Sequence, residues 1–381
     1  MKKLLLINFC NGLYGGIESF LVNAFECLNK KEFTVTFLTC GKSTYDIKRE
    51  SIMALGGKID VIPILANRNI NKIRLYFALK QYLKKEKPDI VHINTGTLSL
   101  HLLASEAARI ENIPQIICHS HNFLPNTLKR KEKLKNIIKM KIFNNANIRL
   151  ACSTGAANWI FPSQAVENGE VIIIPNGIDT DKFKYSDEKR IAFRKKMGFS
   201  NELLIGNIGR FQGQKNHNFM IEIMKEVIKL RPDAKLLLVG NGDLLPIIKQ
   251  KVIDVNLTNQ VLFLGEQNNI DTFLSAIDVF IFPSIYEGFG IAAVEAQAAG
   301  AKVIMSTTVP KETNVTGNAK YISISEINDA ITWAKEICNQ ENKLNRLAQN
   351  NLVYNAGFDI HSSYRQMIDI YREVSQNDDY K

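Results

Sequence analysis

The feature that most constrains the fold of this chain is a long alternation of short apolar segments with helical segments. The first apolar series lies at Leu4–Asn8, Thr34–Leu38, Ile59–Ile62, Ile90–Ile93, Gln115–Cys118, Ile148–Cys152 and Val171–Ile174. Helical periodicity fills the stretches between them, as in Ile17–Leu28, Ile73–Lys84 and Leu98–Ile110. Short segments rich in β-branched residues, separated by helices, predict parallel strands joined by right-handed crossovers. The first half therefore predicts one doubly wound α/β sheet.

A second series of the same kind begins after the turn-forming segment Pro175-Asn-Gly-Ile-Asp179. Its apolar segments lie at Leu203–Ile208, Lys235–Val239, Val261–Leu264, Val279–Phe282 and Lys302–Ile304, and helical pattern fills residues 324–376. A chain of 381 residues also exceeds the size at which a single core is the rule. We therefore expect two doubly wound domains, residues 1–178 and 179–357, followed by a final helix over about 358–376.

Composition is ordinary for a water-soluble protein, with 45% hydrophobic and 23% charged residues. No apolar run approaches the roughly 18 residues that a membrane-spanning helix needs. The segment Met1–Ile7 resembles a signal peptide, but Asn8 ends the apolar run early and no small-residue cleavage site follows. The six cysteines show no CxxC or framework spacing, which is typical of reduced thiols. These features predict a cytoplasmic protein.

The positive charge of the chain is concentrated in its first half. Residues 1–178 carry 24 Lys and Arg against 13 Asp and Glu, a net charge of +11. The whole chain has a net charge of +10, so the second half is almost neutral. The densest basic segment is Lys129–Lys141, where the apolar residues with helical spacing are Leu134, Ile137, Ile138 and Ile142. This pattern suits a helix lying on an anionic membrane surface, and it equally suits a core-packed helix with a solvated basic back.

Two loops that follow predicted strands suit an anionic ligand. The first, Asn11–Glu18, contains Gly15 and Gly16 and precedes a helix whose N-terminal N–H groups favour an anion. The second follows the first strand of the second series and holds Arg210 and Lys215 in a glycine-containing turn before a helix. An arginine fork suits phosphate oxygens, and a lysine adds a point charge.

A third loop, within Ser284–Ala296, brackets a Gly-x-Gly turn with two acids. The turn would aim the N–H groups of Gly290 and Ile291 at an anion. Glu287 stands just before the following helix and Glu295 lies on it. Carboxylates accept two O–H bonds from a vicinal diol, so one acid could bind a sugar and the other a ribose. The three loops together predict a clamp for a nucleotide sugar.

Four motifs in this chain resemble those of retaining glycosyltransferases of family 4. They are Gly15-Gly-Ile-Glu18, Pro175-Asn-Gly-Ile-Asp179, Gly209-Arg-Phe-x-x-x-Lys-Asn-His217 and Pro283-Ser-x-x-Glu-Gly-Phe-Gly-x-x-x-x-Glu-Ala296, the last being similar to the E-x7-E motif of the family. The motifs keep family order and span nearly the whole chain. Smaller segments resemble the branch that builds capsules and exopolysaccharides, namely Cys118-His-Ser-His-Asn122, Cys152-Ser153 and Glu295-Ala-Gln-Ala-Ala-Gly300.

The resemblance implies the GT-B fold, in which two Rossmann-like domains face a cleft and the final helix crosses back to the first domain. It implies transfer of a hexosyl or N-acetylhexosaminyl group with retention. The donor, a nucleotide sugar and most often a UDP-sugar, would lie mainly on the second domain. The acceptor, a saccharide or lipid-linked saccharide, would lie mainly on the first.

By the motifs, Arg210 and Lys215 would bind the donor diphosphate, where they would stabilise charge on the leaving nucleotide. Glu295 would hold the ribose, and Glu287 the transferred sugar. The other donor-binding positions that the motifs imply are Gly15, Gly16, Gly209, Gly288, Phe289, Gly290 and Ile291, and our choice for the base contact is Gly265, Glu266 and Gln267.

The family also places a histidine near the sugar, and this sequence offers His119 and His121, one step of strand alternation apart. Both can face the same side, and we prefer His121. The segment Asp179-Thr-Asp181 matches a DxD pattern that binds metal in another glycosyltransferase fold. Here it belongs to the Asn-Gly-Ile-Asp segment, where Asp179 is expected to cap a turn. We therefore expect no metal and no cofactor.

Three other functions were weighed against this interpretation. A nicotinamide-dependent dehydrogenase should show GxGxxG after its first strand and an acid after its second, but the second strand here ends in Leu38-Thr-Cys-Gly41. A nucleic-acid-binding protein would explain the basic charge, yet no recognition motif accompanies it, and we expect no nucleic acid partner. A sugar-nucleotide 2-epimerase of the same fold stays open as the nearer alternative.

Overall fold

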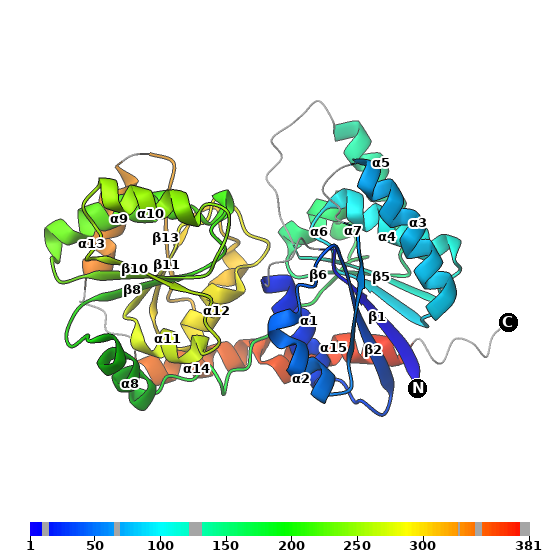
Figure 1. Ribbon diagram of the computed structural model, residues 1–381, viewed down its shortest axis with the longest axis horizontal. Coiled ribbons are helices and arrows are strands. Elements are labelled where there is room, and N and C mark those ends of the chain that lie inside the picture. The colour runs from blue at the N-terminus through cyan, green and yellow to red at the C-terminus, as the bar shows by residue number, and fades with distance from the viewer. Residues whose placement is uncertain (10–14, 65–68, 122–131, 327, 340–344, 374–381) are drawn as a thin grey trace. The chain divides into compact units, whose positions relative to one another are not determined.

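The computed structural model describes residues 1–381 except 10–14, 65–68, 122–131, 327, 340–344 and 374–381. The chain divides into two compact units, one formed by Met1–Gly177 with Ile360–Lys381 and the other by Ile178–Asp359. Each unit holds one parallel sheet with helices on both of its faces (Figure 1). The predicted pair of doubly wound α/β domains is therefore confirmed. In the described part of the chain, no helix combines the length and apolarity needed to cross a membrane.

The first unit is built on a sheet with the order β3-β2-β1-β4-β5-β6-β7. The strands are β1 (Lys2–Ile7), β2 (Phe33–Cys40), β3 (Lys58–Ile62), β4 (Ile90–Ile93), β5 (Gln115–Ser120), β6 (Ile148–Ala151) and β7 (Ile172–Ile173). The helices are α1 (Gly16–Cys27), η1 (Asp46–Lys48), α2 (Arg49–Ala54), α3 (Asn69–Glu86), α4 (Leu98–Ile110), α5 (Glu132–Asn145), α6 (Thr154–Ile160), α7 (Ser163–Glu167) and α15 (Ile360–Glu373). The strand order reverses between β1 and β4, which are hydrogen-bonded neighbours.

The last helix belongs to the core of the first unit. Helices α1 and α15 lie together on one face of the sheet, while α3 and α4 lie on the other (Figure 1). The side chains of Tyr364, Met367 and Tyr371 are buried against strands β1, β2 and β4. Their spacing of three and four residues is the apolar stripe of an amphipathic helix. The expectation that the final helix packs on the first domain is met by this arrangement.

The second unit is built on a sheet with the order β10-β9-β8-β11-β12-β13. The strands are β8 (Leu204–Ile208), β9 (Lys235–Val239), β10 (Val261–Gly265), β11 (Val279–Phe282), β12 (Lys302–Ser306) and β13 (Lys320–Ile322). The helices are α8 (Asp187–Met197), η3 (Gly213–Lys215), α9 (His217–Leu230), α10 (Leu245–Asp254), α11 (Ile270–Ala276), α12 (Ile291–Ala298), η4 (Lys311–Thr313), α13 (Asp329–Cys338), α14 (Arg346–Val353) and the π-helical turn η5 (Tyr354–Phe358). Strand β13 was not predicted from the sequence.

Two adjacent segments carry the chain from one unit to the other, at residues 177–178 and 359–360. Ile178 and Asp359 form an isolated parallel bridge, and Thr180 Oγ1 donates to Asp359 Oδ2 over 2.7 Å. Gly177 lies so close to α15 that a Cβ atom there would stand 2.6 Å from the side chain of Ser363. This close approach explains why the Asn-Gly-Ile-Asp segment requires glycine at its second position.

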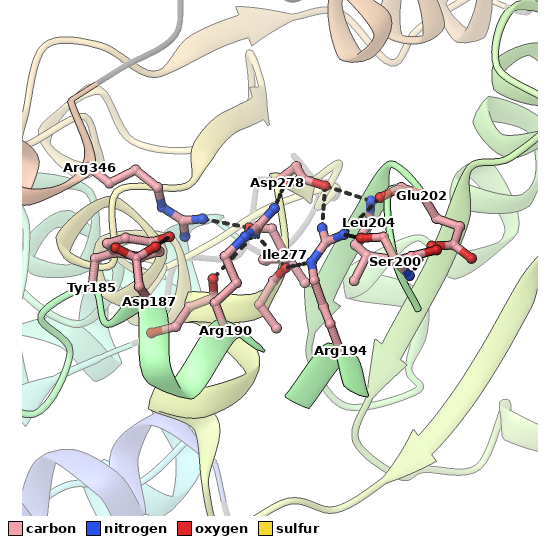
Figure 2. Close-up of polar contacts among 12 residues, drawn as sticks. Tyr185, Asp187, Arg190, Arg194, Ser200, Glu202, Leu204, Ile277, Asp278 and Arg346 are labelled. Atoms are coloured by element: carbon pink, nitrogen blue, oxygen red, sulfur yellow. Dashed lines mark hydrogen bonds and ion pairs between the residues drawn. The ribbon is translucent and has the colours of Figure 1, made fainter. Parts of the chain in front are cut away.

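A cluster of three arginines around Asp278 secures the amino-terminal edge of the second sheet (Figure 2). Arg190 and Arg194 each contact one carboxylate oxygen of Asp278, at 2.6 and 2.7 Å. The N–H group of Leu204 donates to the same carboxylate over 2.9 Å. Arg346 donates to carbonyl groups at the ends of α11 and α12, where cations suit the helix dipole. Burial lowers the pKa of Arg346 to about 10. The loops that follow β8, β9, β10 and β11 lie at the opposite, carboxyl-terminal edge.

Candidate active site

Two of the sequence-predicted residues, Lys215 and Glu287, meet at the carboxyl-terminal edge of the second sheet. Lys215 ends the short helix η3 after β8, and Glu287 lies in the loop after β11. Their side chains form an ion pair of 2.6 Å and are 17% and 6% exposed. Gln214 Nε2 donates to the second oxygen of Glu287 over 3.2 Å and to the Tyr286 carbonyl over 3.0 Å. Low exposure strengthens this charge pair relative to one in water.

The ion pair lies at the point where the strand order of the sheet reverses. Strand β8 continues to β9 on one side, whereas β11 lies on its other side. In open α/β sheets, ligands bind in the crevice outside the carboxyl ends of the strands at this switch point. Lys215 Nζ also lies 4.7 Å from the ring centre of Phe282, the last residue of β11. An aromatic face beside the ammonium group is a favourable neighbour for a cation.

The glycine turn before α12 is shaped and held by a second loop. Gly290 has φ of +94°, and a Cβ atom there would stand 3.0 Å from the ring of Phe282. Thr313 Oγ1 donates a hydrogen bond to the carbonyl of Phe289. Helix α12 begins at Ile291, and its N-cap residue is Gly290, which has no side chain to cap the first N–H groups. These N–H groups are therefore available to an anion, as the Gly-x-Gly pattern predicts. Gly288 lies in the same turn.

Glu295 lies on the second turn of α12 and is half-buried. Burial raises the pKa of Glu295 to about 7, and the nearby charge of Lys182 opposes this shift. The carboxyl group therefore changes charge near neutral pH, which is unusual for a glutamate. Groups with such shifts are concentrated at functional sites.

Arg210 lies in the loop after β8, and this loop is braced by a neighbour that the sequence analysis did not single out. Gly240 and Gly242 follow β9 with φ of +133° and +152°. A Cβ atom at Gly240 would stand 2.2 Å from the carbonyl oxygen of Gly209. Phe211 donates from its N–H to the Asn241 carbonyl over 2.9 Å. In the sequence, the Gly-x-Gly pattern at Gly240 and Gly242, directly after the apolar segment Lys235–Val239, could have indicated this second loop.

The residues chosen for the base contact lie at the end of the next strand. Gly265 has φ of +67°, and its carbonyl accepts from the Gly240 N–H over 2.8 Å. Glu266 and Gln267 are exposed, and Gln267 Nε2 donates to the Leu264 carbonyl over 2.5 Å. The loops that follow β8, β9 and β10 therefore lie side by side at one edge of the sheet.

In the first unit, Gly15 and Gly16 stand at the start of α1, after residues 11–14, which lie outside the described part of the chain. Gly15 is the N-cap of α1 and has no side chain to bond its first N–H groups. Glu18 is buried, and its carboxylate accepts from Asn8 Nδ2 over 2.9 Å. This bond ties the first turn of α1 to the end of β1. Glu18, the glutamate of the Gly-Gly-Ile-Glu motif, therefore helps to hold α1 against the end of β1.

His119 and His121 lie at and just after the end of β5, and both are buried. Their ring centres are 4.0 Å apart. Two further histidines, His92 and His101, are buried beside them and were not singled out from the sequence. Burial lowers the pKa of all four imidazoles, so they are neutral at physiological pH. The prediction that His119 and His121 can face the same side fits this geometry.

Among the described residues, no group of three or more His, Cys, Asp or Glu side chains could hold a metal ion. Asp179 Oδ1 accepts from the Lys182 N–H over 2.8 Å, which is the turn-capping role expected of it.

Helix α5 presents a different apolar face from the one expected. The sequence placed Leu134, Ile137, Ile138 and Ile142 on one face. Ile142 is buried and Ile138 is half-buried, while Leu134 and Ile137 are each 56% exposed. Met140 is 46% exposed on the same side. A helical turn of 3.6 residues puts Lys133 and Lys141, both exposed, beside this apolar stripe. The part of the basic segment before residue 132 lies outside the described residues.

Comparisons with known proteins identify the family. Residues 189–352 match the family described as glycosyl transferases group 1, and residues 14–182 match Glycosyltransferase Family 4. EpsF of Bacillus subtilis (strain 168) is 30% identical over 338 residues, covering 85% of this chain and 84% of EpsF. The chain belongs to glycosyltransferase family 4.

Another member of the family is similar over almost its whole length. The UDP-Gal:alpha-D-GlcNAc-diphosphoundecaprenol alpha-1,3-galactosyltransferase of Escherichia coli is 30% identical over 387 residues, covering 96% of this chain and 95% of that protein. The crystal structure of Anabaena HepE in complex with UDP and glucose superposes with a TM-score of 0.78, at 17% identity, covering 98% of this chain and 100% of that chain. This family 4 glycosyltransferase therefore has the GT-B fold.

Proposed function

We propose that the protein moves a hexosyl or N-acetylhexosaminyl group from a UDP-sugar to a lipid-linked saccharide in surface-polysaccharide synthesis, with retention at the anomeric carbon. The observation that carries the proposal is the Lys215–Glu287 pair at the β8/β11 switch point. A cation suited to phosphate oxygens and a carboxylate suited to sugar hydroxyls lie there together. The E. coli relative named above takes UDP-Gal and forms an α-linkage according to its name, which supports both the donor and the stereochemistry.

We assign each donor group to a loop at the carboxyl edge of the second sheet. Arg210 and Lys215 bind the diphosphate and stabilise the charge that develops on it as the bond to the sugar breaks. The open N–H groups of Gly290 and Ile291 add to this stabilisation. The Glu287 carboxylate accepts hydrogen bonds from the sugar hydroxyls.

The nucleoside is assigned to the neighbouring positions. Glu295 accepts from the ribose diol, and residues 265–267 at the end of β10 contact the base. In the first unit, Gly15 and Gly16 allow the start of α1 to approach the donor, and His119 and His121 contact the sugar. The two cations supply the positive charge for the leaving group, so we propose that turnover needs no divalent metal.

We further propose that the enzyme reaches its acceptor at an anionic membrane surface. The exposed face of α5 joins three apolar side chains to two lysines, which is the composition of a helix that lies in the interface. A lipid-linked acceptor would be held at that surface.

The test is incubation of the purified protein with UDP-glucose, UDP-galactose and their N-acetylhexosamine counterparts, with and without a polyprenyl-diphosphate-linked sugar. We expect acceptor-dependent release of UDP from one donor and, by NMR of the product, an α-linkage. Lys215→Ala should lower kcat/KM by about 10²-fold, as for loss of one charge-stabilising group. Formation of a 2-epimer without transfer would favour the epimerase alternative. Loss of activity in EDTA, restored by a metal, would contradict metal independence.

A further inference from the structure

Three buried side chains of the first unit form a hydrogen-bonded series that ends at one of the candidate sugar-binding histidines. Tyr371 Oη, on α15, lies 2.5 Å from His92 Nδ1 on β4. His92 Nε2 lies 3.2 Å from His119 Nδ1 on β5. The three side chains are essentially inaccessible to solvent. The two imidazole planes are within 6° of parallel, so the N–H of one can point in-plane at the other.

The direction of these hydrogen bonds follows from counting donors and acceptors. Within the described residues, the Tyr371 hydroxyl has no acceptor other than His92 Nδ1. If it accepted from His92 instead, its own proton would be left unpaired in the core, which is costly. Tyr371 therefore donates, and the neutral ring of His92 carries its single proton on Nε2. Burial raises the pKa of Tyr371 and lowers that of His92 to about 3, which keeps both groups neutral.

The proton position of His119 then follows. Its Nδ1 accepts from His92, so the single proton of the neutral His119 ring lies on Nε2. His119 Nε2 is buried, and no described residue accepts from it. His101 Nε2 donates to the His119 carbonyl over 3.1 Å and holds the backbone of this residue in place. Such an orphaned donor in a native core calls for a partner.

His121 carries its proton on the same nitrogen, but its unpaired ring nitrogen is an acceptor. Asn94 Nδ2 donates to the His92 carbonyl over 3.1 Å, which turns Asn94 Oδ1 toward His121 Nε2 at 2.8 Å. An amide oxygen only accepts, so His121 carries its proton on Nε2 and presents a bare Nδ1. His121 Nδ1 is likewise buried without a described partner. Two rings with centres 4.0 Å apart thus present one donor and one acceptor.

We propose that Tyr371 and His92 are positioning residues that hold the His119 proton on Nε2, so that His119 donates to, and His121 accepts from, a hydroxyl of the transferred sugar. A hydroxyl group both donates and accepts, which matches such a pair. This inference rests on the proposed glycosyl transfer for its ligand. The proton positions themselves do not depend on it. The last helix thereby sets the state of a residue on β5 through His92 on β4.

The first test measures proton positions by long-range 1H–15N NMR on protein labelled with 15N-histidine, without any substrate. We expect wild-type His92 and His119 to carry their protons on Nε2. Tyr371→Phe removes only the hydroxyl group, and we expect the His92 and His119 signals to move toward the Nδ1–H form. The matched control is Tyr364→Phe, because that hydroxyl on the same helix donates to the Gly177 carbonyl. A wild-type His119 with its proton on Nδ1 would overturn the proposal, and this measurement needs no variant.

The second test measures kinetics and binding. Tyr371→Phe should lower kcat/KM for the sugar donor roughly tenfold, as for removal of an outer-sphere partner that orients a histidine. The affinity for UDP, which lacks the sugar, should not change, and Tyr364→Phe should behave as wild type. If the NMR signals move as expected but turnover does not change, the sugar contact is refuted while the proton positions stand. If UDP affinity falls equally, the substitution acts through general structure and the positioning role is refuted.

Discussion

The ammonium group of Lys215 lies 2.6 Å from the carboxylate of Glu287, so the cation proposed for the diphosphate is paired with the acid proposed for the sugar. A bound donor must therefore share Lys215 between a phosphate and this carboxylate. Gln214 donates to the second carboxylate oxygen and keeps Glu287 oriented. On the proposed assignment the pair couples the diphosphate contact to the sugar contact, and Glu287 and Glu295 should affect different parts of the donor.

We expect Glu287→Gln to weaken binding of the sugar part of the donor and Glu295→Gln to weaken binding of its ribose. Glu287→Gln removes the competitor for Lys215, so UDP alone should bind as well as or better than to wild type. The same variant should lower kcat/KM for the UDP-sugar by about 10²-fold, because the sugar loses a charged acceptor. Glu295→Gln should weaken UDP and the UDP-sugar alike, since both contain the ribose. Calorimetry with both ligands measures this, and equal losses in both variants would refute the division.

The raised pKa of Glu295 predicts that UDP binding depends on pH. The ribose diol donates to a carboxylate, so binding favours the ionised form. It should tighten from pH 5.5 through about 7, where half of the Glu295 carboxyl groups are ionised, and level off roughly one pH unit higher. The terminal phosphate of UDP also titrates at about pH 6. Glu295→Gln lacks the titrating carboxyl, so the pH dependence that it keeps measures the contribution of the phosphate. We expect the variant to show a smaller pH dependence than wild type. Binding that tightens on acidification relative to the variant would contradict the ribose contact.

The same pKa predicts the pH dependence of stability, with a definite sign. The pKa in the folded protein, about 7, lies above the ordinary value of 4.5. The folded state therefore binds this proton more tightly than the unfolded state does, and stability from this group falls as pH rises from about 4.5 through 7. Glu295→Gln should flatten that fall in urea titrations of the free protein. An unchanged pH profile would show that the carboxyl is not held in the environment the structure gives it.

Gly240 is expected to be intolerant of any side chain. Its φ of +133° and the 2.2 Å approach of the Gly209 carbonyl to a Cβ atom mean that Gly240→Ala must separate two backbone segments. We expect a loss of about 2 kcal/mol or more in the free energy of unfolding. The affinity for UDP should also fall, because Arg210 follows Gly209 directly. Gly213→Ala is the control: Gly213 lies in the loop after β8 that holds Arg210, with open space around its Cβ position, and the substitution should cost much less.

Asp278 is expected to be essential for the stability of the second unit. Asp278→Ala would leave Arg194 buried and without its carboxylate, and removal of one partner of a buried ion pair typically costs about 3–5 kcal/mol. Asp233→Ala is the matched control, because Asp233 pairs with Arg231 on the surface and should contribute below about 1 kcal/mol. Urea unfolding of both variants compares them. Similar losses in the two variants would show that the arginine cluster is not a stabilising centre.

The alternation of apolar and helical segments was sufficient to predict both sheets, because parallel strands buried on both faces leave a continuous apolar signal. The final helix was predictable for a similar reason, since Tyr364, Met367 and Tyr371 mark one face. Strand β13 was not predicted because it has only three residues, of which Lys320 is exposed and the other two are half-buried. Short edge strands carry too few apolar residues to be recognised.

The contacts within the site could not be predicted, because they depend on which strands are neighbours. Lys215 and Glu287 are 72 residues apart, and only the placement of β8 beside β11 joins them. Tyr371 and His92 are 279 residues apart and meet only because α15 packs over β4. The motifs placed Lys215 and Glu287 in loops that follow strands. The sheet order decided which of them touch.

The orientation of α5 could not be predicted either. Periodicity indicated that Leu134, Ile137, Ile138 and Ile142 could share a broad face, but only part of that face packs on the core. The structure buries Ile142, half-buries Ile138 and leaves the other two exposed. Lys135 lies 5.9 Å from the ring centre of Trp159, and Lys139 donates to the Asn158 carbonyl over 2.6 Å. These two lysines therefore contact the protein itself and are unsuitable for testing membrane contact.

The suitable residues are Lys133 and Lys141, which flank the exposed apolar stripe of α5. Each lysine near an anionic surface contributes about 1 kcal/mol, so reversal of two charges should weaken binding to anionic lipid strongly. We expect wild type to sediment with anionic but not with neutral vesicles, and less so as salt rises. Lys133→Glu with Lys141→Glu should stay in the supernatant. The matched control reverses Lys195 and Lys196, two exposed lysines on α8 of the second unit, and should still sediment. If both double variants sediment equally, α5 is not the membrane contact, and its lysines serve solubility alone.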